Sequence, residues 1–133
     1  MANPLLLDIA LFLKSKSLVS GDGIDTFRDI FPEEPDNIVV LYEYAGSPAF
    51  LQDSAVHRSV QISARNSDAD AARQKIVSIF TAFQTAQKTD GRVDLTSKRW
   101  AQVYLRQPPF LLRRDENNRT IYVFNIGVTT TID

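Results

Sequence analysis

Two apolar segments near the C-terminus, separated by a short charged stretch, most constrain how this chain can fold. Residues 100–114 and 120–132 are rich in apolar and aromatic side chains, and five charges lie between them within residues 113–119. This pattern predicts an antiparallel hairpin with a polar tip. Pro108 and Pro109 cannot donate backbone hydrogen bonds, so the first strand must bend there or lie at the edge of a sheet.

Two adjacent asparagines at the tip predict the geometry of this hairpin. Asn117 and Asn118 fit the centre of a two-residue type I′ turn, since asparagine tolerates the left-handed conformation. The register then pairs Glu116 with Arg119, Leu112 with Val123, and Phe110 with Asn125. Both faces of the hairpin are apolar in this register. One face needs a helix over it, and the other needs a second cover, either the N-terminal helix or another subunit.

The rest of the chain alternates between helical and extended patterns. Asn3 and Pro4 predict the start of a first helix, which Gly21 and Gly23 end. Ser67 is expected to cap a second helix, in which apolar residues recur every three or four positions. Extended segments and one long loop complete the chain, at residues 24–31, 37–44 and 57–64 for the strands and 45–56 for the loop.

These elements predict an α+β fold: a mainly antiparallel sheet of about four to five strands with two helices packed on one face. The chain has 133 residues and is 44% hydrophobic, which suits a single domain over residues 1–133. The N-terminus lacks the basic segment of a signal peptide. No apolar run reaches the roughly 20 residues that a membrane span needs. We therefore expect a soluble, intracellular product.

The residue types provide no catalytic, metal or cofactor site. The chain has no cysteine, which excludes thiol nucleophiles and most zinc sites, and His57 is its single histidine. No G-x-S-x-G motif accompanies His57, and no glycine-rich phosphate loop occurs. We therefore expect a protein that is not an enzyme and that binds no cofactor and no metal.

The overall charge gives no general case for nucleic-acid binding, because 15 basic and 16 acidic side chains leave a net charge of −1. A local nucleic-acid surface is an alternative, since bases and aromatics interleave at Lys98, Arg99, Trp100, Tyr104 and Arg106. The alternation of a strand would distribute these side chains over both faces, which weakens that interpretation.

Several short segments, taken in order, carry a family resemblance. They are Val60-Gln61-Ile62, Arg65, a helix rich in alanine and isoleucine, Gln107-Pro108, Leu111 or Leu112, Arg114-Asp115-Glu116, Arg119 and Tyr122-Val123-Phe124-Asn125. From the strand at 38–44 to the end, the chain resembles the tail terminator, or minor capsid, proteins of long-tailed bacteriophages. That family commonly carries Asn-Gly in the turn where this chain has Asn117-Asn118.

The resemblance implies a structural role in the virion. Such proteins form a ring, usually of six subunits, on the head-proximal end of the tail tube. The ring halts tube polymerisation and presents a surface to the head–tail connector protein, and DNA later passes through its lumen. The family has no enzymatic activity and no cofactor, and its members assemble in the host cytoplasm. A neighbouring head–tail protein, such as a connector stopper or a tail-completion factor, is the alternative.

The candidate assembly residues are the exposed ones in the long loop and at the hairpin tip. Each could contact a neighbouring subunit or the tube, and each could equally be a solvated loop residue, since exposed ion pairs contribute only about 0–1 kcal/mol. The residues are Phe50, Leu51, Arg113, Arg114, Asp115, Glu116 and Arg119.

Overall fold

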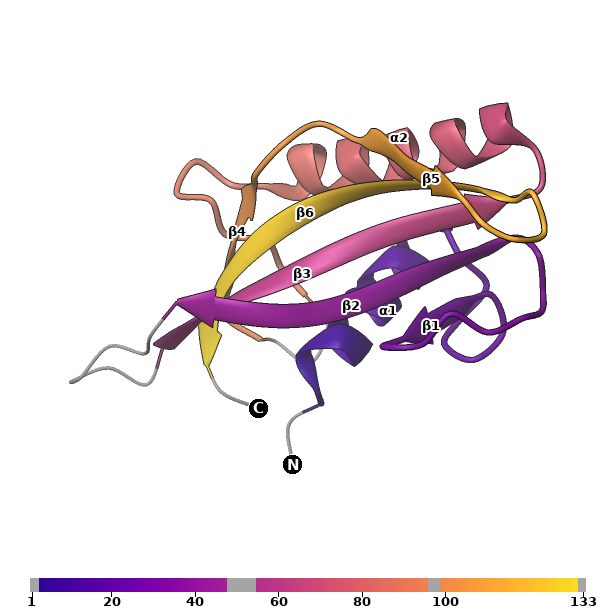
Figure 1. The fold of residues 1–133 in the computed structure, drawn as a ribbon. Helices are drawn as coiled ribbons and strands as arrows, with labels where there is room; N and C mark the ends of the chain where they lie inside the picture. The colour runs from indigo at the N-terminus through magenta and orange to yellow at the C-terminus, as the bar shows by residue number, and fades with distance from the viewer. Residues whose placement is uncertain (1–2, 48–54, 96–98, 132–133) are drawn as a thin grey trace.

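A computed structural model describes residues 3–47, 55–95 and 99–131 (Figure 1). Within these ranges, two helices and six strands follow one another. Their bounds are α1 Leu5–Ser15, β1 Thr26–Arg28, β2 Ile38–Ser47, β3 Ala55–Asn66, α2 Ala69–Ala86, β4 Ala101–Leu105, β5 Phe110–Arg114 and β6 Thr120–Thr131. The predicted α+β class is confirmed, with one strand more than the four to five expected.

All six strands form one sheet, in which only the pairing of β1 with β2 is parallel. The order is β1-β2-β3-β6-β4, and β5 also pairs with β6. β6 is long enough to hold two short strands on its outer side, because β5 pairs with its beginning and β4 with its end. The two segments expected as one strand interrupted by Pro108 and Pro109 are therefore two strands in succession along the same edge.

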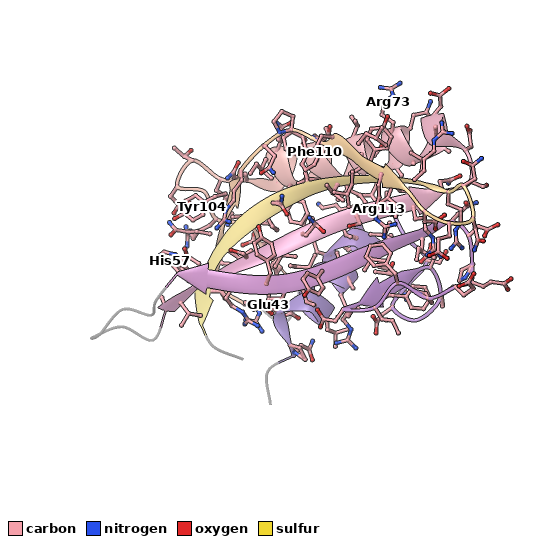
Figure 2. The ribbon with its side chains drawn as sticks, in the orientation of Figure 1. Glu43, His57, Arg73, Tyr104, Phe110 and Arg113 are labelled. Carbon is pink, nitrogen blue, oxygen red and sulfur yellow. The ribbon has the colours of Figure 1, made fainter. Side chains whose placement is uncertain are left out.

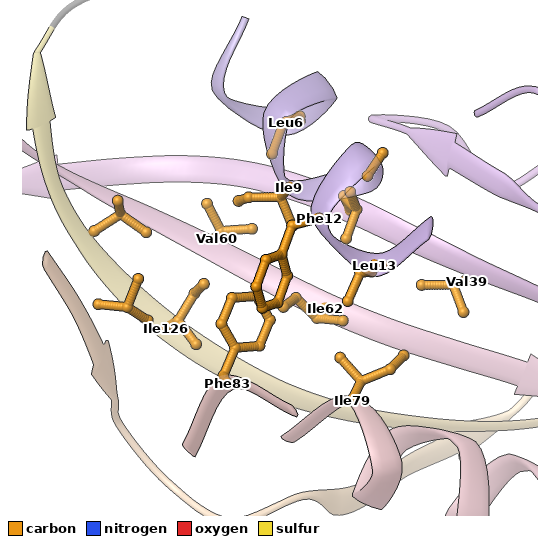
Figure 3. Close-up of a cluster of buried hydrophobic side chains, with 14 of the residues drawn as sticks. Leu6, Ile9, Phe12, Leu13, Val39, Val60, Ile62, Ile79, Phe83 and Ile126 are labelled. Atoms are coloured by element: carbon orange, nitrogen blue, oxygen red, sulfur yellow. The ribbon is translucent and has the colours of Figure 1, made fainter. Parts of the chain in front are cut away.

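One face of the sheet carries the hydrophobic core. Val60, Ile62 and Ile126 on this face are fully buried in one cluster with side chains from both helices. Phe12 of α1 stacks on Phe83 of α2, with ring centroids 5.0 Å apart (Figure 3). The regular apolar spacing of α2 brings one stripe of that helix into the cluster, as predicted.

The opposite face of the sheet lies toward the viewer in Figure 1, with the helices behind it. Tyr104 is exposed on this face (Figure 2), and Tyr42 in β2 is also exposed. The guanidinium of Arg106 lies directly over Gly127, where an added Cβ would come within 2.9 Å of Arg106 Nη2. Side chains of α1 belong to the core on the helix-covered face of the sheet. The N-terminal helix is therefore not the cover that was predicted for the second apolar face of the hairpin.

The helix ends differ from those expected. α1 ends at Ser15 and not at Gly21, because Ser17 adopts a left-handed conformation (φ 60°). The N–H of Leu18 then donates to Leu13 O at 3.0 Å, which closes the helix in a Schellman motif. In α2 the capping residue is Asp68 and not Ser67. The cap moves because the Asp68 carboxylate accepts from the backbone N–H of Asp70 at 3.4 Å.

The hairpin turn also differs from the predicted two-residue type I′ turn. The N–H of Asn118 donates to Asp115 O at 3.0 Å, and Asn118 has a φ of 60°. Glu116 and Asn117 therefore occupy the centre of the turn, and Asn118 takes the following left-handed position of a three-residue loop. The longer loop and a bulge after Leu111 change the register, and the pairs become Phe110 with Val123, Leu111 with Tyr122, Arg113 with Ile121 and Arg114 with Thr120.

Candidate functional site

The charged hairpin tip is organised by one carboxylate. Asp115 accepts hydrogen bonds from the backbone N–H groups of Asn117 at 3.0 Å and Arg119 at 2.9 Å. The same carboxylate forms an ion pair with Arg119 Nε at 2.7 Å. The side chain of Arg119 is almost fully buried. The acid expected opposite Arg119 was Glu116, and the longer turn puts Asp115 there instead.

A proline-rich loop, residues 32–36, is held against this end of the sheet by two buried arginines. Arg119 Nη1 donates to the carbonyl oxygen of Glu33 at 2.5 Å and to Asp36 Oδ1 at 3.2 Å. Arg65 donates to the carbonyl oxygens of Pro32 and Pro35, both at 2.7 Å, and of Asp36 at 3.1 Å. We call Arg65, Arg119 and the loop 32–36 the arginine clamp.

The pKa values of the clamp follow from this packing. Burial lowers the pKa of the Arg65 guanidinium, and the positive charge of Arg119 lowers it further. For Asp115, burial alone would raise the pKa, but the hydrogen bonds and charge of Arg119 outweigh it and hold the pKa below its usual value. For Arg119, burial is likewise outweighed by Asp115, so its pKa is raised. Asp115 and Arg119 thus favour each other's charged form.

The remaining tip residues are exposed. Arg114 Nη1 approaches Asn118 Oδ1 at 3.4 Å, and in the described residues no carboxylate pairs with Arg113 or Arg114. An open depression of about 300 Å³ lies between the tip and the clamp loop, with Phe31 and Arg113 among its lining residues. Of the candidate assembly residues, Phe50 and Leu51 lie outside the described residues.

A second buried charge pair, which was not predicted from the sequence, lies at the other end of the sheet. Arg99 Nε pairs with Asp8 of α1 at 2.7 Å, and both side chains are nearly inaccessible. Arg99 also donates to the backbone carbonyl of Asn3. Asp8 lies in the first turn of α1, where an acid also complements the helix dipole. Its spacing from Leu5 and Phe12 puts it on the buried stripe of α1, which is the signal that could have found the pair.

The side chains considered for catalysis, metal binding or nucleic-acid binding make ordinary contacts within the fold. His57 Nδ1 lies 2.6 Å from Thr129 Oγ1 on the neighbouring strand. Within residues 3–47, 55–95 and 99–131, no group of three or more His, Cys, Asp and Glu side chains is arranged to hold a metal ion. The segment with interleaved basic and aromatic residues alternates between the two faces of the sheet, as expected for a strand. Ala101 and Val103 are buried, whereas Trp100 and Tyr104 are exposed.

A comparison with protein families decides what kind of protein carries this arrangement. Residues 12–132 match the model of the bacteriophage tail terminator protein family. The chain belongs to that family. The tail terminator match includes the whole sheet, α2 and the clamp, and it starts within α1. None of the curated proteins matches the chain.

Membership makes this chain a structural protein of the phage tail, located in the virion. It associates with other tail and head components. In the described part of the chain, neither helix is long and apolar enough to cross a membrane.

Proposed function

We propose that this protein forms a ring on the head-proximal end of the tail tube, ends tube polymerisation there and offers the joining surface to the head–tail connector protein. The observation that carries the proposal is the family match over residues 12–132, nearly the whole chain. The ring would contain six copies of a single domain spanning residues 1–133, and DNA would cross its lumen without sequence-specific binding. The role needs no catalysis and no cofactor.

The exposed tip residues support a role in assembly. Asp115 and Arg119 have their charges satisfied within the chain, since they form an ion pair with each other at 2.7 Å. Arg113, Arg114 and Glu116 are exposed and remain available for a neighbour. We therefore propose that these three residues carry the contacts of the tip, while the clamp below them keeps the tip in position.

Tail assembly with and without this protein tests the proposal. Particles that lack it should carry overlong or uncapped tails in electron micrographs, and supplying the protein should restore a uniform tail length. Normal tails on heads that have lost their DNA would instead identify a connector stopper. Tubes whose length is the same with and without the protein would contradict the terminator role.

A further inference from the structure

The most exposed large apolar side chains of the described chain lie along two opposite edges of the sheet. Ile24 and Ile30, which flank β1, are 64% and 59% exposed, and Leu111 in β5 is 54% exposed. β1 is the last strand on one side of the sheet, and β5 pairs with β6 on the other. Figure 1 shows β1 at the lower edge and β5 at the upper edge.

The β5 edge has the character of a contact surface. All five residues of β5 are exposed, and three of them in succession are large and apolar: Phe110, Leu111 and Leu112. In the described residues β5 pairs with β6 alone, so its outer side has no strand partner. Edge strands that stay in solvent are usually protected by charges along their length, and a run of apolar residues does the opposite.

The two edges also carry opposite charge. Residues 99–114 contain four arginines and no acidic residue. Arg99 is paired with Asp8, but among the described residues no carboxylate pairs with Arg106, Arg113 or Arg114. Residues 22–30 contain three aspartates and one arginine, a net charge of −2, and because Asp22 is paired with Arg28 this excess lies on Asp25 and Asp29. An apolar and basic edge thus lies opposite an apolar and acidic edge.

We propose that the β5 edge of one copy binds the 22–30 edge of a second copy. Two different surfaces of the same chain then meet head to tail, which is the type of contact that closes into a ring. Leu111 and Leu112 would pack against Ile24 and Ile30, and Arg113 and Arg114 would face the aspartates. This inference rests on the proposed ring and specifies which surfaces of the chain build it.

Chemical cross-linking tests the contact, because the wild-type chain contains no cysteine. In the double variant I24C/L111C, each copy carries one thiol on either edge. A short bismaleimide reagent, added to the variant bound to tail tubes, should produce a ladder of terminator oligomers on a denaturing gel. The matched control is I24C/V77C, which moves the second thiol to an exposed position on α2. The control should give about tenfold less ladder, because its second thiol lies outside the proposed contact.

Charge reversal provides the second measurement. R113E/R114E in the I24C/L111C background should reduce the ladder about tenfold, because like charges then face each other. R73E in the same background reverses an exposed arginine on α2 and should leave the ladder unchanged. A ladder insensitive to R113E/R114E, or cross-links to the tube protein alone, would overturn the proposal.

Tail length, scored on the same samples, separates this proposal from the proposed function. If I24C/L111C restores uniform tails but gives no more ladder than I24C/V77C, the copies meet elsewhere and the terminator role stands. If the wild-type protein leaves tail length unregulated, the terminator role fails whatever the gel shows.

Discussion

Buried arginines lie at both ends of the sheet, but their partners differ. At one end Arg99 is bound to the carboxylate of Asp8, and both groups are nearly inaccessible. At the other end Arg65 is bound to the carbonyl oxygens of the loop 32–36. Removing one member of the first pair leaves an opposite charge buried, whereas the carbonyls around Arg65 are neutral and lie in a surface loop. Substitution in the pair of Asp8 and Arg99 should therefore destabilise the chain more than substitution of Arg65.

Asp8→Ala should have the largest effect. The variant leaves the guanidinium of Arg99 buried without this carboxylate, and breaking a buried pair in this way costs about 3–5 kcal/mol. We expect the free energy of unfolding, measured by urea titration, to fall by that amount. Asp70→Ala is the matched control, because Asp70 is also an acid in the first turn of a helix but is exposed. Equal losses in the two variants would show that helix-dipole complementarity, and not the buried pair, accounts for the effect.

Arg65→Ala should come second, at about 2 kcal/mol, because it removes hydrogen bonds to carbonyl groups of the loop 32–36 that water can partly replace. Arg65→Lys keeps the charge but not the planar fork of donors, so it should recover only part of the loss. Both values come from the same urea titration. Arg73→Ala, at an exposed arginine on α2, should change stability by less than about 0.5 kcal/mol. A loss from Arg65→Ala larger than that from Asp8→Ala would reverse the comparison.

The sequence predicted the elements better than it predicted the partners of these charges. Apolar spacing located α2 and the long strands β2, β3 and β6, since helical and extended periodicities differ clearly. The predicted two-residue turn was wrong. Both asparagines suit a left-handed backbone, and the hydrogen bonds that Asp115 accepts from the N–H groups of Asn117 and Arg119 select Asn118 for that conformation. Asp8 and Arg99 are 91 residues apart. The charge pattern of a sequence indicates only which nearby residues are exposed or complement a helix dipole. It therefore cannot predict an ion pair between residues as far apart as Asp8 and Arg99.

Asp115→Asn should change how stability depends on pH. The pKa of Asp115 lies below its usual value of 3.8 in the folded state. Its contribution is therefore fully present above pH 3.8 and is lost as pH falls through the lower, folded pKa. At pH 7 the variant should be less stable than wild type by about 1–2 kcal/mol, the range for a charged hydrogen bond.

The unfolding free energy measured at acidic pH tests this prediction. The difference in unfolding free energy between wild type and Asp115→Asn should shrink as pH falls below 3.8, since the wild-type carboxyl then also becomes neutral. Glu116→Gln is the matched control, because Glu116 is the exposed acid beside it in the same turn. A difference that stays constant down to pH 2 would mean that the turn geometry of Asp115, and not its charge, stabilises the tip.

Arg113→Ala should have the smallest effect on the stability of the isolated protein. It extends the comparison of the buried arginines to an exposed one. Arg113 projects from the exposed strand β5, and in the described residues it has no carboxylate partner (Figure 2). Its loss should change the free energy of unfolding by less than about 0.5 kcal/mol. Arg65 lies in the same row across the sheet, because both residues stand beside Ile121 on β6. Arg65 therefore stabilises the fold because it binds the loop 32–36, whereas Arg113, at the edge of the sheet, is not needed for folding. If Arg113→Ala destabilised the chain as much as Arg65→Ala, Arg113 would belong to the clamp and would not be free to bind a neighbour.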